Sequence, residues 1–159
     1  MTDTDSGFVD LHTHSTASDG ACGPREVVRA ARELGLAAIA LTDHDTVDGL
    51  AEARAEGAAL GVRIVPGIEL SAVEGDVETH VLGLHLQDTG RLDEQLRNLR
   101  AMRLTRAERI VGRLNELGVR VTLEDVLSQS AGGAVGRPHI ARALVNEGWA
   151  TDMRDAFDR

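Results

Sequence analysis

Two histidines stand one residue apart at the end of an apolar run, in the stretch FVDLHTHSTASDG (residues 8–20). Residues i and i+2 of a β-strand point to the same side, so His12 and His14 would aim two imidazoles at one point. Asp19 follows five residues after His14, where turn-forming residues replace the apolar ones. Imidazole and carboxylate groups together suit zinc, manganese or iron. The stretch therefore predicts one half of a metal site.

Further candidate ligands follow later apolar segments of strand length. His44 lies in LTDHDT, Glu69 lies near the end of VRIVPGIEL, and His80 lies within VETHVLGLHL. A site for more than one ion needs more than four ligands, and a carboxylate can bridge two ions. The complete candidate set is His12, His14, Asp19, His44, Glu69 and His80.

Each of these residues also has a plain structural interpretation. The histidine pair could be an exposed strand end, and Asp19 could be a turn residue beside a glycine. Asp43 and Asp45 are interpreted as caps of the helix that follows them. His80 alone would be an ordinary hydrogen-bonded strand histidine, and His85, among apolar residues, is expected to be structural.

The elements that must position the candidates alternate between strand and helix. Strands are predicted over 8–12 (buried), 36–45, 62–70 and 77–86, and helices over 23–35 and 46–61, the second with Thr46 as its N-cap and Gly61 as its end. This alternation predicts an α/β architecture built largely on parallel strands. Because sites assemble at the carboxyl ends of such strands, the polar clusters there predict one shared site.

From residue 89 the pattern becomes helical. Leucines recur at helical spacing up to Gly118, Thr122 opens a Thr-x-x-Asp capping box, and Pro138 lies at a helix start. We expect an α/β metal-binding part over residues 1–88 and a helical insertion or cap over residues 89–159.

Seven arginines recur along the first of these predicted helices, at positions 91, 97, 100, 103, 106, 109 and 113. Steps of three residues drift around a helix instead of forming one stripe. We therefore interpret them as a solvated face paired with Asp93, Glu94 and Glu108, in preference to an electropositive surface that attracts anions.

Composition narrows the class of function. The net charge of −9 disfavours a protein that binds duplex DNA through a basic surface, but not an enzyme that handles phosphates through metal ions. All 17 basic residues are arginines, which excludes a P-loop lysine and Schiff-base chemistry in this chain. Cys22 is the only cysteine, and no signal peptide or membrane-length apolar run is visible. The expected location is the cytoplasm.

Four motifs, DLHTHSTASDG, LTDHDT, PGIELSA and ETHVLGLHL, together resemble the polymerase and histidinol phosphatase (PHP) family. The resemblance is closer to its nucleotide phosphoesterase branch, which includes 3′,5′-nucleotide bisphosphatases and 5′→3′ exoribonucleases, and GRPHIARAL is similar to a helical insertion of that branch. It implies a distorted (β/α)7 barrel with a trinuclear metal centre. No His-Pro and no Asp-x-His element follows His80, so the chain is expected to be an N-terminal portion of a longer protein.

The resemblance also implies a role for each candidate. It places one ion at His12 and His14, a second at His80 that shares Glu69 with the first, and a third at Asp19 and His44. The expected ions are Mn²⁺ or Zn²⁺, with Fe²⁺ as an alternative, up to three in a complete site. Arg137 and His139 of GRPHIA are implied to contact a substrate phosphate. The alternative for both is a simple helix start with a surface arginine.

The expected activity is metal-dependent phosphoester hydrolysis, in which a hydroxide bridging two ions attacks phosphorus. The resemblance implies that the substrate is a nucleotide or an oligonucleotide end. One alternative is a phosphatase of a non-nucleotide monoester such as histidinol phosphate. Another is a non-catalytic module, either a degenerate barrel fragment or a helical binding unit over residues 122–159.

Overall fold

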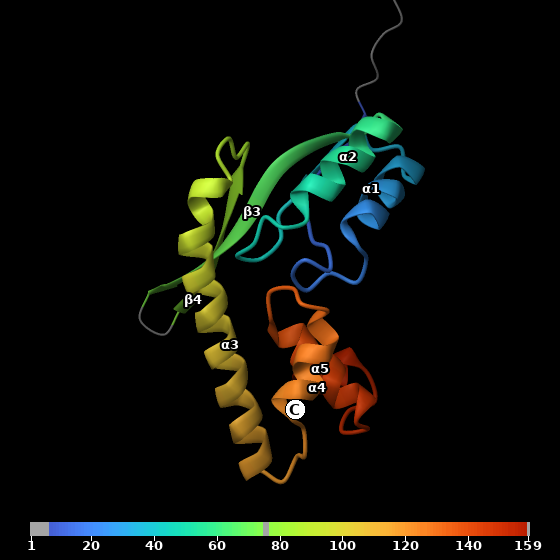
Figure 1. Ribbon diagram of the computed structural model, residues 1–159. Helices are drawn as coiled ribbons and strands as arrows, with labels where there is room; N and C mark the ends of the chain where they lie inside the picture. The colour runs from blue at the N-terminus through green and yellow to red at the C-terminus, as the bar shows by residue number, and fades with distance from the viewer. Residues whose placement is uncertain (1–6, 75–76, 159) are drawn as a thin grey trace, which may run out of the picture.

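The computed structural model describes residues 7–74 and 77–158, without the side chains of Val73, Arg91, Asp93 and Glu94. The α/β part comprises β1 (Val9–Thr13), α1 (Pro24–Glu33), β2 (Ala38–Leu41), α2 (Leu50–Leu60), β3 (Arg63–Glu74) and β4 (Val77–Leu84). The helical part comprises the 3₁₀ turn η1 (Gly90–Leu92), then α3 (Asp93–Glu116), α4 (Leu123–Ser130), α5 (Arg137–Asn146) and α6 (Met153–Asp158) (Figure 1).

The strands form one sheet in the order β1-β2-β3-β4. β1, β2 and β3 run parallel, as predicted, whereas β4 runs antiparallel to β3. Only residues 75 and 76 separate these two strands in the sequence, which leaves no room for the crossover that a parallel pair requires. The expectation of largely parallel strands is therefore correct for the first three strands only.

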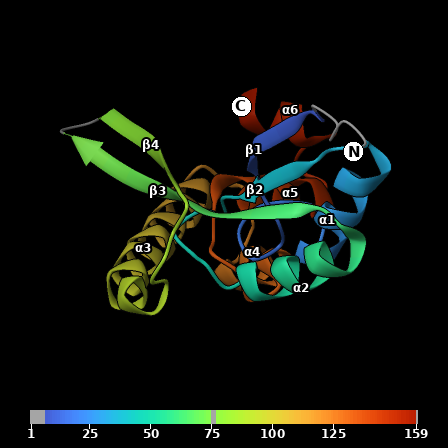
Figure 2. The same ribbon diagram turned by 90° about the horizontal axis from the view of Figure 1, so that it is seen from above.

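Helices α1 and α2 lie side by side against the sheet and bury its first core (Figure 2). This core consists of Val28, Ala31, Ile39, Leu41, Leu50, Ala53 and Val62. The prediction that the first strand is buried is wrong, because β1 is the edge strand and Phe8, Val9 and Leu11 remain exposed.

The predicted helix ends are largely confirmed. Gly61 ends α2 in the left-handed region, at φ = +72°. Thr122 caps α4, its hydroxyl accepting a hydrogen bond from the Asp125 N–H at 3.1 Å. The predicted cap of α2 is wrong: the N-cap is Gly49, and the Thr46 hydroxyl instead accepts from a backbone N–H in the turn before the helix.

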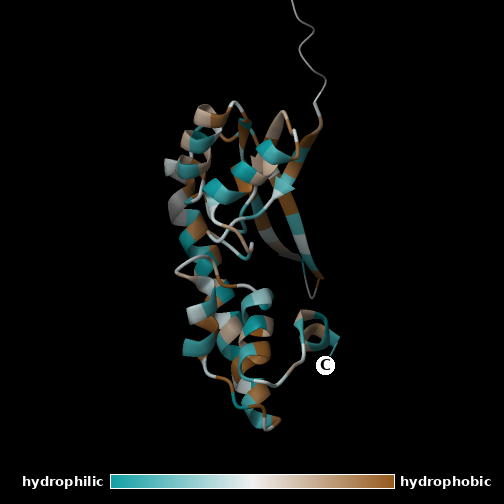
Figure 3. Cartoon of the chain, turned by 90° about the vertical axis from the view of Figure 1, so that its right-hand side faces the viewer, coloured by the Kyte–Doolittle hydropathy of each residue, from teal (hydrophilic) through white to brown (hydrophobic). Residues whose placement is uncertain are grey.

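A second core lies among α3, α4 and α5, where apolar positions gather between the lower helices in Figure 3. Its buried members are Ala107, Val111, Val121, Val126, Val135, Ile140, Ala143, Leu144 and Ala150. Helix α3 extends from the β3–β4 hairpin to this second core and so links the two parts (Figure 1). None of the helices in the described ranges is both long and apolar enough to cross a membrane.

Two helical glycines should respond in opposite ways to alanine. A Cβ at Gly112 of α3 would meet no atom within 4 Å, so Gly112→Ala should stabilise the fold by about 0.5–1 kcal/mol through helix propensity. A Cβ at Gly57 of α2 would lie 2.5 Å from Ile64 and 2.6 Å from the Val62 carbonyl, so Gly57→Ala should destabilise by about 1–3 kcal/mol. Chemical denaturation measures both, and shifts of the same sign would contradict this packing.

Candidate metal centre

The structure brings all six predicted ligands together at one edge of the sheet. His12 and His14 lie at the end of β1, His44 follows β2 and forms an isolated bridge with Glu69 of β3, and His80 comes from β4. Three groups form in which one ligand atom of each member lies within 4.8 Å of the others: His12, His14 and Glu69; His14, Asp19 and His44; His44, Glu69 and His80.

Glu69 occupies the middle of the site. Its Oε2 lies 2.8 Å from His12 Nε2 and 2.9 Å from His14 Nε2, and its Oε1 lies 2.8 Å from His80 Nδ1. The four imidazoles form a row, with successive ring centroids 5.1, 4.7 and 4.7 Å apart along His12, His14, His44 and His80. One buried carboxylate of β3 thus lies among imidazoles from β1, from the segment after β2 and from β4.

Asp19 reaches the same row from the loop between β1 and α1. Its Oδ1 lies 3.3 Å from His14 Nδ1 and its Oδ2 lies 3.6 Å from His44 Nε2. Asp43 anchors this loop, because its buried carboxylate accepts hydrogen bonds from the Ser15 N–H, the Ser15 hydroxyl and the Ser18 hydroxyl, each at 2.7 Å. The interpretation of Asp43 as a helix cap is therefore wrong.

Asp45 is not a helix cap either. Its side chain is fully buried, its φ is +52°, and it accepts hydrogen bonds from the backbone and hydroxyl of Ser71 at 2.8 Å. The Arg103 side chain of α3 also donates to it. Asp45 therefore faces the sheet and α3 instead of the start of α2.

The carboxylates of the site are held ionised. Burial raises the pKa of Asp19, but the hydrogen bond to His14 and the nearby imidazoles outweigh this and leave the pKa at about 2. Burial likewise raises the pKa of Glu69. The hydrogen bond to His12 and the surrounding imidazoles outweigh this effect, so the pKa of Glu69 lies below its ordinary value. Both groups are therefore anionic near neutral pH and attract a cation.

The imidazoles differ in charge state. Burial lowers the pKa of His44 and the Arg103 guanidinium lowers it further, to about 4, so His44 stays neutral, as a metal ligand must be. Burial also lowers the pKa of His14, but its hydrogen bond with Asp19 and the charges of Asp19 and Glu69 outweigh this and raise the pKa overall. Binding a metal through His14 would therefore displace a proton at slightly acidic pH.

His44 supplies a direct test of whether the site fits a cation. Its Nδ1 is buried and, within the part of the chain that the structure describes, has no hydrogen-bond partner, with Glu69 Oε2 3.7 Å away. A buried polar atom left unpaired is costly, and a bound ion or water is one arrangement that would satisfy it. The unpaired nitrogen, the anionic carboxylates and the row of imidazoles fit divalent metal ions.

The PHP domain family model matches residues 10–150. This chain belongs to the PHP domain family. A 5′-3′ exoribonuclease of Escherichia coli is 39% identical to it over 163 residues, covering 100% of this chain and 56% of the relative. A 3′,5′-nucleoside bisphosphate phosphatase of Chromobacterium violaceum is 36% identical over 151 residues, covering 94% and 53%.

The solved structures confirm the fold class predicted from the sequence. A Bifidobacterium adolescentis protein assigned as a metal-dependent phosphoesterase superposes with a TM-score of 0.88 at 37% identity, covering 98% of this PHP chain and 56% of that one. The chain thus has the α/β fold of one part of a PHP phosphoesterase. It spans about half the length of the curated relatives it matches.

The two predicted phosphate-contacting residues of this PHP chain differ in environment. Arg137 is half-exposed and pairs with Glu78 at 3.2 Å. His139 is buried, its Nδ1 accepts from the Gly136 N–H at 2.9 Å, and its ring lies near the backbone of Ser18. His139 therefore joins the helical part to the loop that carries Asp19.

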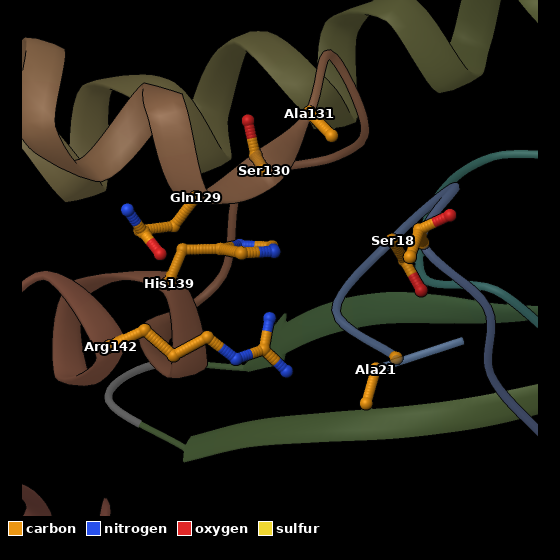
Figure 4. A pocket seen from close by; sticks show the side chains of 9 residues that line it. Ser18, Ala21, Gln129, Ser130, Ala131, His139 and Arg142 are labelled. Atoms are coloured by element: carbon orange, nitrogen blue, oxygen red, sulfur yellow. The ribbon is translucent and has the colours of Figure 1, made fainter. Parts of the chain in front are cut away.

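A cavity of about 250 Å³ lies between that loop and the helices, lined by Ser18, His139 and Arg142 among others (Figure 4). Arg142 extends across it and donates a hydrogen bond to the Asp19 carbonyl at 2.9 Å. Sequence reasoning missed Arg142, although it lies within the GRPHIARAL motif that pointed to Arg137 and His139.

The interpretation of the α3 arginines as a solvated face is wrong for three of them. Arg103 and Arg106 pair with Asp45 and Glu78 of the α/β part, and Arg100 donates to the Asp45 carbonyl. The proposed partners Asp93 and Glu94 lie outside the described side chains.

His85 stands apart from the three ligand groups. It is exposed and has a φ of +59°, so it is not part of either apolar core. Its exposure follows from its place just beyond the end of β4.

Proposed function

We propose that this PHP chain carries the metal centre of a phosphoesterase that acts on nucleotides or oligonucleotide ends. The carrying observation is the set of three donor groups that share His14, His44 and Glu69 and therefore lie close enough to hold neighbouring ions. The relatives named above, an exoribonuclease and a nucleoside bisphosphate phosphatase, support the choice of nucleotide substrates.

In this proposal the ions are Mn²⁺ or Zn²⁺, with Fe²⁺ as an alternative, and up to three are held. His12 and His14 would hold one ion, His80 would hold a second that shares Glu69 with the first, and Asp19 and His44 would hold a third. When bound, divalent ions supply positive charge to phosphoryl oxygens and make water a better nucleophile near neutral pH. The ionised carboxylates and neutral His44 keep these positions ready for cations.

Residues of the helical part complete the proposed site. The exposed guanidinium of Arg137 lies beside Glu78, two residues from His80, and supports a contact with a substrate phosphate. His139 would serve by holding the loop of Asp19 through Ser18. The separate apolar cores support a division into a metal-binding part, residues 1–88, and a helical cap, residues 89–159. The exposed free thiol of Cys22 suits a cytoplasmic location.

A panel of substrates, assayed with the purified natural protein, tests this function. A nucleoside 3′,5′-bisphosphate, a 5′-phosphorylated oligoribonucleotide and histidinol phosphate are each assayed with Mn²⁺, with Zn²⁺ and with excess EDTA. We expect phosphate or nucleotide release from one of the first two, abolished by EDTA and by the joint change His12→Ala and His14→Ala. Preference for histidinol phosphate would favour the monoester alternative. Hydrolysis that survives both treatments would refute the metal assignment.

A further inference from the structure

The side chains of Asp45, Ser71 and Arg103 form a closed ring of hydrogen bonds next to the metal centre. Asp45 Oδ1 accepts from the Ser71 N–H, and its Oδ2 accepts from the Ser71 hydroxyl, both at 2.8 Å. Arg103 donates through Nε to the same Asp45 oxygen and through a terminal nitrogen to the Ser71 hydroxyl at 2.6 Å. The side chain of Asp45 is fully buried and that of Arg103 is 6% exposed. The ion pair between Asp45 and Arg103 is therefore shielded from solvent, which strengthens its charged hydrogen bond, whereas Ser71 is partly buried.

The ring joins the two segments that carry central ligands. Asp45 directly follows His44, and Ser71 lies two residues after Glu69 on β3. Backbone bonds tie the same segments, since the Asp45 N–H donates to the Glu69 carbonyl at 3.0 Å and the Glu69 N–H donates to the Asp43 carbonyl at 3.2 Å. The separation of His44 and Glu69 thus depends on contacts that Asp45 and Ser71 make.

The third member of the ring comes from a different part of the fold. Arg103 lies in α3, which also packs in the second core, and Arg100 one turn earlier donates to the Asp45 carbonyl at 3.2 Å. Without Arg103, the buried Asp45 carboxylate would lose its ion-pair partner, and such a group moves toward water or draws water in. Either response would displace the adjacent His44.

We propose that Arg103 is a positioning residue of the metal centre, which fixes His44 relative to Glu69 and thereby couples metal binding to the docking of α3. This inference rests on the proposed metal-dependent function. Groups that orient metal ligands commonly influence affinity by about 10–100-fold when they are removed. Because such coupling is reciprocal, bound metal should in turn hold α3 more firmly against the sheet.

Because Arg103 is positively charged, a positioning role can be distinguished from a direct electrostatic effect on the metal ion. A guanidinium near a cation site repels the cation, so its removal would tighten metal binding if charge alone mattered. Loss of positioning weakens binding instead. The two explanations therefore predict opposite signs for Arg103→Gln. They also differ for Arg103→Lys, which keeps the charge but cannot form the forked contact to Asp45 and Ser71.

The test measures Mn²⁺ affinity by titration calorimetry for the wild-type chain, Arg103→Gln, Arg103→Lys and the control Arg109→Gln, an exposed arginine on the same helix. We expect affinity to fall by about 10–100-fold in both Arg103 variants and to stay unchanged in the control. Hydrogen exchange of the α3 amides should slow on adding Mn²⁺ to the wild type and respond less in Arg103→Gln.

Unchanged or tighter Mn²⁺ binding in Arg103→Gln would overturn the proposal. Should that variant fail to fold, Ser71→Ala breaks the same ring without removing a charge and should weaken binding in the same direction. Unchanged affinity in Ser71→Ala would also overturn it. A wild-type chain that binds no metal would refute the proposed function itself, whereas normal wild-type binding with unaffected variants would refute only the coupling.

Discussion

Glu69→Gln should lower the affinity for divalent metal by more than about 100-fold, the largest loss that we expect from any single substitution. The carboxylate contacts His12, His14 and His80, and it belongs to two of the three donor groups. Glutamine keeps the shape of the side chain but removes the negative charge and the second acceptor oxygen. Two ion positions should therefore weaken together, and hydrolysis should fall with them.

Metal content by elemental analysis and affinity by calorimetry measure this effect. Glu74→Gln is the matched control, because Glu74 is an exposed glutamate on the same strand and should bind metal as the wild type does. Equal metal content in Glu69→Gln and wild-type chains would show that Glu69 is not a shared ligand. A similar loss in both variants would point to a general charge effect.

Asp43→Ala should destabilise the fold by at least about 3 kcal/mol, because three hydrogen bonds to one buried carboxylate are lost together. Those bonds hold Ser15 and Ser18, so the loop that presents Asp19 should also lose its fixed position. Metal binding that depends on Asp19 should weaken even at temperatures at which the variant stays folded.

Urea denaturation gives the change in the free energy of unfolding for this variant. Asp48→Ala is the control, since Asp48 is an exposed aspartate in the same loop region and surface changes of this kind usually stay within about 0.5 kcal/mol. A loss below about 1 kcal/mol in Asp43→Ala would contradict an anchoring role for this carboxylate.

The sequence revealed those parts of the site that follow from periodicity. Alternation along a strand placed His12 and His14 together, and the shared edge of parallel strands placed His44 and Glu69 beside them. Helix ends at Gly61 and Thr122 were predictable because their chemistry is local. The proximity of these four candidates therefore followed from short-range patterns and a simple topology, whereas His80 on antiparallel β4 and Asp19 in a loop were added to them by the family resemblance.

The contacts that support the site could not be predicted from local sequence patterns. Asp43 and Asp45 precede a helix, so local rules favoured capping, whereas their actual partners lie in the first loop, on β3 and on α3. Arg103 looked like one of a series of surface arginines, and only the docking of α3 makes it a buried partner of Asp45. Contacts between distant segments depend on tertiary packing, which overrides local preference.

The metal content of the chain, purified without chelator and counted by elemental analysis, tests the central claim most directly. We expect two or more ions per chain, because the ligand atoms within each donor group already lie within 4.8 Å of one another and the Glu69 carboxylate can bridge two ions. One ion or none would contradict a multi-metal centre built from these strands alone.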